Sequence, residues 1–368
     1  MARTSLGSTL PDFPWNLLEP AKDTASRHPE GIVNLSVGSP VDAVAPGIQL
    51  ALAEAAAEPG YPQTIGTPKL RQAITDSLAR RYNAPDVTSV LPVIGTKEAI
   101  AWLPTLLGCA GTVIIPEIAY PTYEVAALLA GATPLRNDYC YELDEDTAAT
   151  IDLVFINSPS NPTGKVLDAD HLRKVIEWAR AHDVVVASDE CYLGLTWEDP
   201  APSILDAEVA GGNFDNLIAI HSLSKTANLA GYRAGFLAGC PTLIAELTEL
   251  RKHAGLMVPA PIQAAMTEAL IDDDHEVLQK LRYASRRAKL MRAVVEAGFE
   301  VVNSEAGLYL WITRNEDCWD TVAWFADKGI LVAPGSFYGP NSQQFVRVAL
   351  TGTDDDVAKF VSRLKDNS

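Results

Sequence analysis

The chain has 368 residues and a formal net charge of −18; 48% of its residues are hydrophobic and 21% are charged. This length exceeds one ordinary core and favours a large domain with a smaller one. The composition is typical of a soluble globular protein, and the negative charge argues against nucleic acid or an anionic membrane as a partner. We therefore expect small-molecule partners.

The cysteines and the N-terminal residues indicate a compartment. The 5 cysteines are odd in number and widely spaced, and they form no Cys-x-x-Cys pair, so neither a disulfide framework nor a metal site is expected. The first residues, MARTSLGSTLPDFPW, lack the apolar run of a secretory signal. No apolar segment approaches the roughly 18–20 residues that span a bilayer. The sequence predicts a cytoplasmic protein with no membrane segment.

In residues 46–265, amphipathic stretches alternate with short apolar runs. The spacing of apolar residues predicts helices over 47–58, 68–82, 96–108 and 168–182. Runs rich in β-branched residues predict strands near 90–94 and over 112–116, 152–158, 184–188, 217–222 and 235–239. This alternation predicts an α/β fold, a three-layer large domain in which helices cover both faces of a mostly parallel sheet.

Residues 266–368 have a different pattern. A long charged helix is predicted over 273–298, and strands are predicted over 308–313, 330–334 and 345–350. These elements indicate a smaller α+β domain. The segment 14–45 is too short and too rich in proline to fold alone, so we expect it to join that domain.

Polar residues follow several of the predicted strands. Gly95 precedes a helix whose first N–H groups, on Thr96 and Lys97, could bind an anion, although an ordinary helix cap explains the same pattern. Asn161 lies in the stretch 159-PSNPTGK, which a plain β-turn also explains. Asp189 ends an apolar strand, where a buried carboxylate is costly without a cation or solvent beside it. Open α/β sheets bind ligands at such strand ends.

Lys225 lies in 221-HSLSKTANLAGYRAG, directly after another predicted strand. Most lysines are solvated, but this one is surrounded by small residues and the hydroxyls of Ser222 and Ser224. A desolvated amine loses its proton more readily and becomes a nucleophile. Arg233 offers a planar fork suited to phosphate. Together the strand ends require a ligand with a phosphate, a group that pairs with a carboxylate, and a carbonyl; pyridoxal phosphate (PLP) has all three.

The ordered motifs resemble the fold-type-I, aspartate-aminotransferase-like class I/II family of PLP-dependent enzymes. In chain order they are 60-GYPQTIGTPKLR, 95-GTKEAI, 116-PEIAYPTYE, 161-NPTG, 189-DECY, 222-SLSK, 231-GYRAG and Arg347. The resemblance implies a PLP-transferase large domain and ping-pong transamination through a Schiff base between PLP and Lys225.

The same resemblance implies a role for each site residue. Lys225 would carry the cofactor and shuttle the proton, and Asp189 would pair with its pyridine nitrogen. The phenolic oxygen would be bound by Asn161 and Tyr192, and Tyr120 would stack on the ring. The phosphate would be held by Thr96, Lys97, Ser222, Ser224 and Arg233.

The substrate and a second subunit complete the site that the resemblance implies. Arg347 would bind the α-carboxylate of the substrate, and the backbone of Gly38 would approach it. Tyr61 resembles the tyrosine that reaches the phosphate of the neighbouring subunit, which implies a homodimer with shared active sites.

Within the family, the stretches 10-LPDFPWNLL, 31-GIVNLSVGSPVDAVAP and 60-GYPQTIGTPKLR resemble the actinobacterial N-succinyldiaminopimelate aminotransferases of lysine biosynthesis. This resemblance implies an amino transfer from N-succinyl-L,L-2,6-diaminopimelate to 2-oxoglutarate. A second cation is then expected for the distal carboxylate, and Lys97 and Arg314 are candidates.

Other functions share some of these residues. The stretch 222-SLSK matches the S-x-x-K signature of serine acyl hydrolases, but the S-D-N and K-T-G motifs that this class needs do not follow it. An aminotransferase for another amino acid, such as aspartate, or a PLP-dependent C–S lyase would keep every cofactor residue. A PLP-sensing DNA-binding regulator fits poorly with the negative charge.

Overall fold

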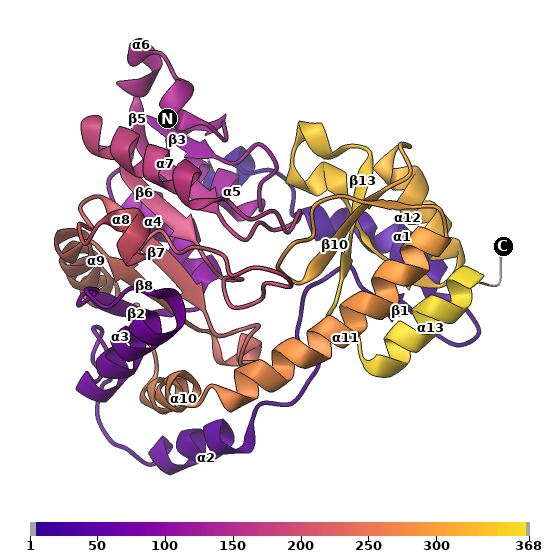
Figure 1. The fold of residues 1–368 in the computed structure, drawn as a ribbon, viewed down its shortest axis with the longest axis horizontal. Coiled ribbons are helices and arrows are strands. Elements are labelled where there is room, and N and C mark those ends of the chain that lie inside the picture. Colours follow the sequence, from indigo (N-terminus) through magenta and orange to yellow (C-terminus); the bar gives the residue numbers. More distant parts are fainter. Residues whose placement is uncertain (1–4, 366–368) are drawn as a thin grey trace.

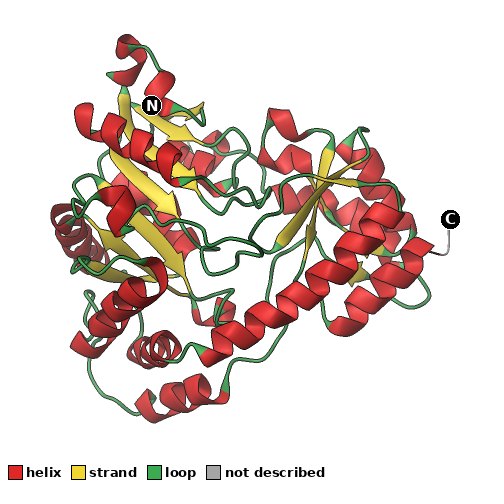
Figure 2. Ribbon diagram, viewed as in Figure 1, coloured by secondary structure: helices red, strands yellow, loops and turns green. Residues whose placement is uncertain are grey.

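The computed structural model describes residues 5–365, and a 7-stranded sheet forms the centre of its larger part (Figures 1 and 2). The strand order is β2-β8-β7-β6-β5-β3-β4. The pairs among β7, β6, β5, β3 and β4 are parallel, and β8 is antiparallel to both of its neighbours, β7 and β2. The predicted mostly parallel sheet is therefore confirmed. The strands are β2 (Val90–Ile94), β3 (Thr112–Ile115), β4 (Thr133–Arg136), β5 (Ile151–Asn157), β6 (Val185–Asp189), β7 (Leu217–Ser222) and β8 (Ala234–Gly239).

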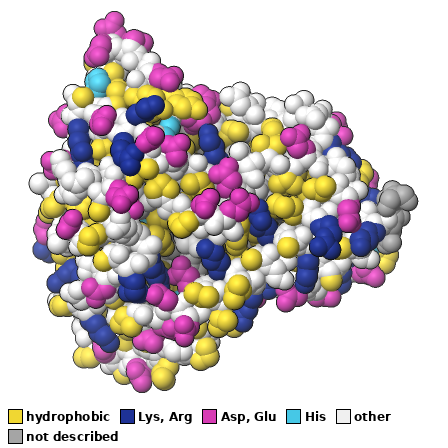
Figure 3. Space-filling view, in the orientation of Figure 1, with side chains coloured by type: hydrophobic (Ala, Val, Ile, Leu, Met, Phe, Trp, Pro, Cys, Tyr) yellow, Lys and Arg dark blue, Asp and Glu magenta, His cyan; other side chains and the backbone are white. Residues whose placement is uncertain are grey.

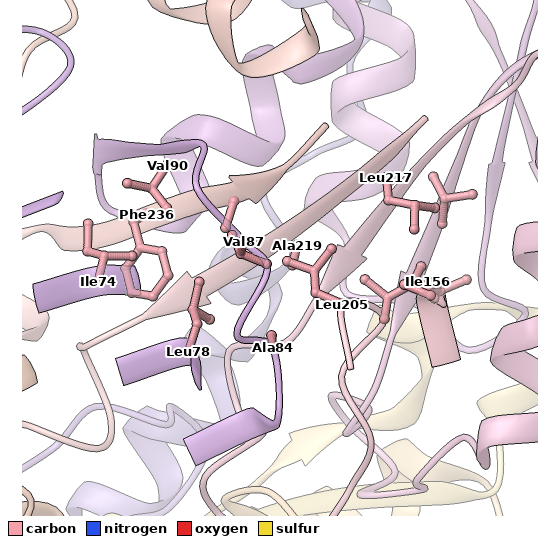
Figure 4. Packing of buried hydrophobic residues seen from close by; sticks show 14 of the residues in the cluster. Ile74, Leu78, Ala84, Val87, Val90, Ile156, Leu205, Leu217, Ala219 and Phe236 are labelled. Atoms are coloured by element: carbon pink, nitrogen blue, oxygen red, sulfur yellow. The ribbon is translucent and has the colours of Figure 1, made fainter. Parts of the chain in front are cut away.

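Helices cover both faces of this sheet, because successive side chains of a strand point to opposite sides. On β5, Leu153 and Phe155 enter one hydrophobic cluster, whereas Val154 and Ile156 enter the other. Figure 4 shows part of the second cluster, in which Ile156 is among the labelled residues. The first face packs against α4 (Thr96–Leu106), α5 (Thr122–Ala130) and α9 (Pro241–Ala254). The second packs against α2 (Pro46–Ala55), α3 (Pro68–Tyr82), α7 (Ala169–Ala181), the short α8 (Ala207–Ala210) and α10 (Ala260–Ile271); the short α6 (Glu145–Ala148) precedes β5.

The limits of α3 follow from local chemistry. The Thr67 hydroxyl accepts a hydrogen bond from the Leu70 amide at 3.2 Å, and Pro68 occupies the first turn. At the other end Asn83 adopts a left-handed conformation with φ 50°. The helix predicted over 68–82 ends where this cap begins.

The smaller part contains two further sheets. One is antiparallel with the order β12-β13-β10-β9, and the other is the parallel pair of β1 and β11. The prediction of a single strand over 330–334 was wrong. The first half of this segment pairs with the N-terminal β1 and the second half with β13, so the segment forms two strands, β11 and β12. The elements are α1 (Glu19–Ser26), β1 (Val33–Asn34), α11 (Asp274–Glu296), β9 (Glu300–Val301), β10 (Tyr309–Thr313), α12 (Cys318–Asp327), β11 (Ile330–Leu331), β12 (Ala333–Pro334), β13 (Phe345–Ala349) and α13 (Asp354–Lys365).

The N-terminal segment and α11 connect the two parts. In the segment 14–45, α1 packs on α12 and β1 pairs with β11.

The boundary expected at 265/266 falls within α10, which packs against α2 and α3 of the larger part. We propose that the smaller domain instead begins at Asp272–Asp273, directly before α11.

The face of the molecule in Figure 3 shows no obvious concentration of one charge. On the face in Figure 3, acidic and basic side chains are interspersed. Within residues 5–365, no helix combines the length and the apolar character needed to cross a membrane.

Candidate active site

A cavity of about 460 Å³ lies where the ends of β5, β6 and β7 meet the smaller part of the molecule. Among the residues predicted from the sequence, Tyr61 lies outside it, with 96% of its side chain exposed. Arg314, a candidate for the distal cation, also lies outside it. The other predicted site residues line the cavity: Gly38, Thr96, Lys97, Tyr120, Asn161, Asp189, Tyr192, Ser222, Ser224, Lys225, Arg233 and Arg347.

Lys225 follows β7 and extends into this cavity. Its Nζ donates a hydrogen bond to the backbone oxygen of Gly38. Burial is the main cause that lowers the pKa of the amine, and the nearby positive charges of Arg347 and Arg233 lower it further. The amine can therefore lose its proton more easily than a surface lysine, as a nucleophile or base requires.

The start of α4 and Arg233 form a positively charged pocket. A Cβ added to Gly95 would lie 2.3 Å from Nη2 of Arg233, so the guanidinium lies directly against this glycine. Gly95 also has φ +75°, a conformation that other residues rarely adopt. The first N–H groups of α4, on Thr96 and Lys97, carry the positive end of the helix dipole. This arrangement suits a phosphate.

Asp189 ends β6 and is only 5% exposed. Its Oδ2 accepts a hydrogen bond from the Tyr123 hydroxyl at 2.6 Å, and Oδ1 accepts one from the Cys191 amide at 3.1 Å. Burial raises the pKa of this carboxyl. Within the described part of the chain no Lys or Arg pairs with it, so a bound cationic group would offset the cost of keeping it ionised.

Arg347 lies on β13 and is 2% exposed. Its Nη1 donates to Oδ1 of Asn161 at 2.8 Å, and its Nη2 donates to the Ser36 oxygen at 2.6 Å. Its Nε is buried and has no hydrogen-bond partner. Because Arg347 also lines the cavity, its buried guanidinium is suited to a carboxylate ligand.

Several lining residues were not predicted from the sequence. The Tyr309 hydroxyl lies 3.1 Å from that of Tyr192, and its ring lies 3.9 Å from the guanidinium carbon of Arg347. Phe13, Trp15 and Cys191 also line the cavity. The signal for Tyr309 was a hydroxyl within the otherwise apolar run 308-LYLWI, since a buried tyrosine needs a polar partner.

The geometry disagrees with two of the alternatives that the sequence left open. Lys225 bonds to Gly38, whereas the Ser222 hydroxyl accepts from the Ser224 amide at 3.2 Å, so the serine-and-lysine-base pairing of an acyl hydrolase is not formed. Arg314 pairs with Glu316 and is not among the residues that line the cavity. Of the two candidates for the distal cation, only Lys97 lines it.

Comparison with known proteins agrees with this geometry. A family model described as aminotransferase class I and II matches residues 30–364. The chain belongs to this family. Its members use pyridoxal phosphate, so the enzyme is a PLP-dependent aminotransferase.

The relatives differ in the substrates that they are named for. A probable aminotransferase of Mycobacterium tuberculosis is 58% identical over 99% of this chain and 87% of its own length. The 4-dedimethylamino-4-oxo-anhydrotetracycline transaminase of Streptomyces rimosus is 50% identical over 96% of this chain and 99% of its own. An LL-diaminopimelate aminotransferase of Dehalococcoides mccartyi is 31% identical, covering 95% of both chains. A solved structure, a probable N-succinyldiaminopimelate aminotransferase of Thermus thermophilus, has a TM-score of 0.84 at 26% identity and covers 96% of this chain and 100% of its own.

The contact between Gly95 and Arg233 leads to a prediction. Gly95→Ala would displace the guanidinium from the phosphate pocket, so the Kd for PLP should rise about 10- to 100-fold, as expected for losing one charge-assisted contact. PLP titration into the apoenzyme, followed by absorbance, measures this change. Gly211→Ala is the control, because Gly211 also has positive φ (+66°) but nothing within 4 Å of an added Cβ. A wild-type Kd in Gly95→Ala would contradict the assignment.

Proposed function

We propose that the cavity residues hold PLP in the roles that the sequence resemblance implies. Three observations support a fit. The pocket at Gly95 and Arg233 suits a phosphate, and the amine of Lys225 suits an aldehyde. The buried carboxyl of Asp189 has no Lys or Arg partner among the described residues and suits a pyridine N–H. Bound PLP would supply an aldehyde carbon that accepts and releases an amino group, and a ring that accepts electrons.

The side chains around PLP then have separate tasks. Asp189 keeps the proton on the pyridine nitrogen, and Tyr123 and the Cys191 amide hold its two oxygens in place. Asn161 and Tyr192 donate to the phenolic oxygen, and Tyr120 packs on the ring. The phosphate is bound by the N–H groups of Thr96 and Lys97 and by the side chains of Ser222, Ser224 and Arg233.

The substrate is oriented by the other end of the cavity. Arg347 binds its α-carboxylate, which places the Cα–H bond within reach of Lys225. The Lys225 Nζ would take this proton as a general base and later give it back as a general acid. Because burial lowers the pKa of the amine, Lys225 loses its proton more easily than a surface lysine and so serves better as a base.

For the amino donor we propose N-succinyl-L,L-2,6-diaminopimelate, with 2-oxoglutarate as the acceptor, in diaminopimelate and lysine biosynthesis. The observation that carries this choice is the position of Lys97. The PLP cavity adjoins a second cavity of about 750 Å³, and Lys97 lines both. A donor with a long second half can extend through this junction, and the names of the two diaminopimelate-related proteins support the same substrate class.

The Lys97 amine is suited to a distal carboxylate. It lies 5.3 Å from the centre of the Phe13 ring and forms no ion pair within the described residues. Burial and the charge of Arg233 lower the pKa of this amine, and a carboxylate beside it would favour the charged form again.

A second candidate is the amination of a polycyclic ketone. The larger cavity has an aromatic lining, which suits a flat ring system, and the relative with 50% identity is named for an anhydrotetracycline substrate. The aromatic residues are Phe13, Trp15, Tyr120, Trp319 and Phe337.

A donor panel separates these functions. We expect the highest kcat/KM with N-succinyl-diaminopimelate among donors that include aspartate, glutamate, alanine and cystathionine, with a 4-oxo-anhydrotetracycline tested as an alternative acceptor. Lys97→Gln should lower kcat/KM for N-succinyl-diaminopimelate about 10- to 100-fold by removing a charge-assisted contact. Alanine is the matched control, because it has no distal carboxylate. Equal losses with both donors, or a preference for another substrate, would contradict the proposal; pyruvate release from cystathionine would indicate a C–S lyase.

We also propose that the enzyme is a homodimer in which Tyr61 enters the cavity of the other subunit. Tyr61 is almost fully exposed on the loop between α2 and α3, and large apolar side chains are also exposed on α2 (Leu50), on the same loop (Ile65) and on α4 (Trp102). Light scattering coupled to size-exclusion chromatography should give twice the chain mass. A monomeric holoenzyme with full activity would contradict this.

A further inference from the structure

The backbone segment 35–42 lies against both Arg347 and Lys225, the residues proposed to bind the substrate and to carry the cofactor. Its first residue is fixed to the smaller part, since the Leu35 amide donates to Leu331 and the Leu35 oxygen accepts from Ala349, each at 2.8 Å. The oxygen of Ser36 then accepts from Arg347, and that of Gly38 accepts from Lys225. One short backbone segment therefore contacts both the substrate-binding arginine and the catalytic lysine.

The other end of this segment is fixed by an ion pair between a buried arginine and a partly buried aspartate. Nη1 and Nη2 of Arg286 donate to the two oxygens of Asp42 at 2.7 and 2.8 Å. The Arg286 side chain is 3% exposed, and its Nε donates to Asp354 at 3.0 Å. Gln279 donates to Asp42 at 2.8 Å. These hydrogen bonds, above all those from Arg286, hold the pKa of Asp42 below its usual range.

Arg286 lies on the same face of α11 as Gln279 and Tyr283, at helical spacings of i, i+4 and i+7. The Tyr283 hydroxyl donates to the backbone oxygen of Lys225 at 3.3 Å. Gln279 accepts from Asn228, which follows Lys225 in the same loop, at 3.0 Å. One helix face thus holds both the loop of Lys225 and the segment that carries Gly38. Figure 1 shows α11 running from beside α10 toward α13 and the smaller part.

We propose that Arg286 is a positioning residue for the transamination, acting through Asp42 on the segment 35–42. The bidentate pair of Arg286 with Asp42 fixes the positions of two backbone oxygens. These are the Gly38 oxygen that accepts from Lys225 and the Ser36 oxygen that accepts from Arg347. A carbonyl displaced by about an ångström would misplace the lysine and loosen the carboxylate site, and errors of this size can cost about 100-fold in rate. Truncating one partner of a buried ion pair also leaves the other uncompensated.

This role differs measurably from a purely structural one. A variant that only unfolds more easily contains less active enzyme, so its kcat falls while its KM stays unchanged. Displacing the segment 35–42 instead affects Arg347 and Lys225 together, so KM rises and kcat falls. The inference does not depend on which amino donor the enzyme uses.

The test compares Arg286→Met and Asp42→Asn with Asp354→Asn. Asp354 contacts the same guanidinium but is 77% exposed and has no bond to the segment 35–42, which makes it the matched control. Steady-state kinetics of the holoenzymes use the amino donor with the highest wild-type kcat/KM. Hydrogen–deuterium exchange of the apoenzymes reports on residues 36–42.

In Arg286→Met and Asp42→Asn we expect KM for the donor to rise with a lower kcat, a loss of at least about 10-fold in kcat/KM, and faster exchange over 36–42. The control should match the wild type in both measurements. If Arg286→Met does not fold, Asp42→Asn alone provides the test, because in that variant Arg286 is retained with its contact to Asp354. Either an unchanged KM or wild-type exchange over 36–42 in a folded variant overturns the proposal.

Discussion

The parallel order of β5, β6 and β7 is the constraint on which the active site depends. Parallel strands end at the same edge of a sheet, so the residues that follow them are brought together although they are far apart in sequence. Asn161, Asp189 and Lys225 each come at or shortly after one of these strand ends. Arg233 lies in the turn between β7 and the antiparallel β8. Its guanidinium there lies against Gly95, at the start of α4.

Burying these charged groups is costly, and their pairing explains how the structure tolerates it. Arg347 shares its donors between Asn161 and Ser36, and Lys225 bonds to Gly38. Asp189 receives two hydrogen bonds but no cation from the described chain, and burial shifts its pKa in the direction expected for such a group. The site is thus arranged so that a bound cofactor and substrate complete it electrostatically.

The sequence predicted the sheet and the polar residues at the strand ends because both follow from patterns that are local in the chain. Other cavity residues, namely Gly38, Tyr120, Tyr192 and Arg347, were predicted only from the family resemblance. Asp189 could be found from an apolar run that ends in a charge, and Lys225 from a charge among small residues shortly after an apolar strand. Tyr123 could not, because it occupies a core position of α5, and only the folded chain shows its hydroxyl bonded to Asp189. The division of 330–334 between two sheets likewise depends on pairing with the distant β1 and β13. The role proposed for Tyr61 depends on a second subunit.

The central claim is that Lys225 is the lysine that carries the cofactor. The most direct measurement is to reduce the holoenzyme with borohydride, digest it and find the phosphopyridoxyl group by mass spectrometry. The account predicts loss of the absorbance above about 400 nm and a label on the peptide that contains Lys225, since a desolvated amine near the phosphate pocket is the one suited to the cofactor aldehyde. A label on Lys97 or on any other lysine, or no label at all, would contradict it.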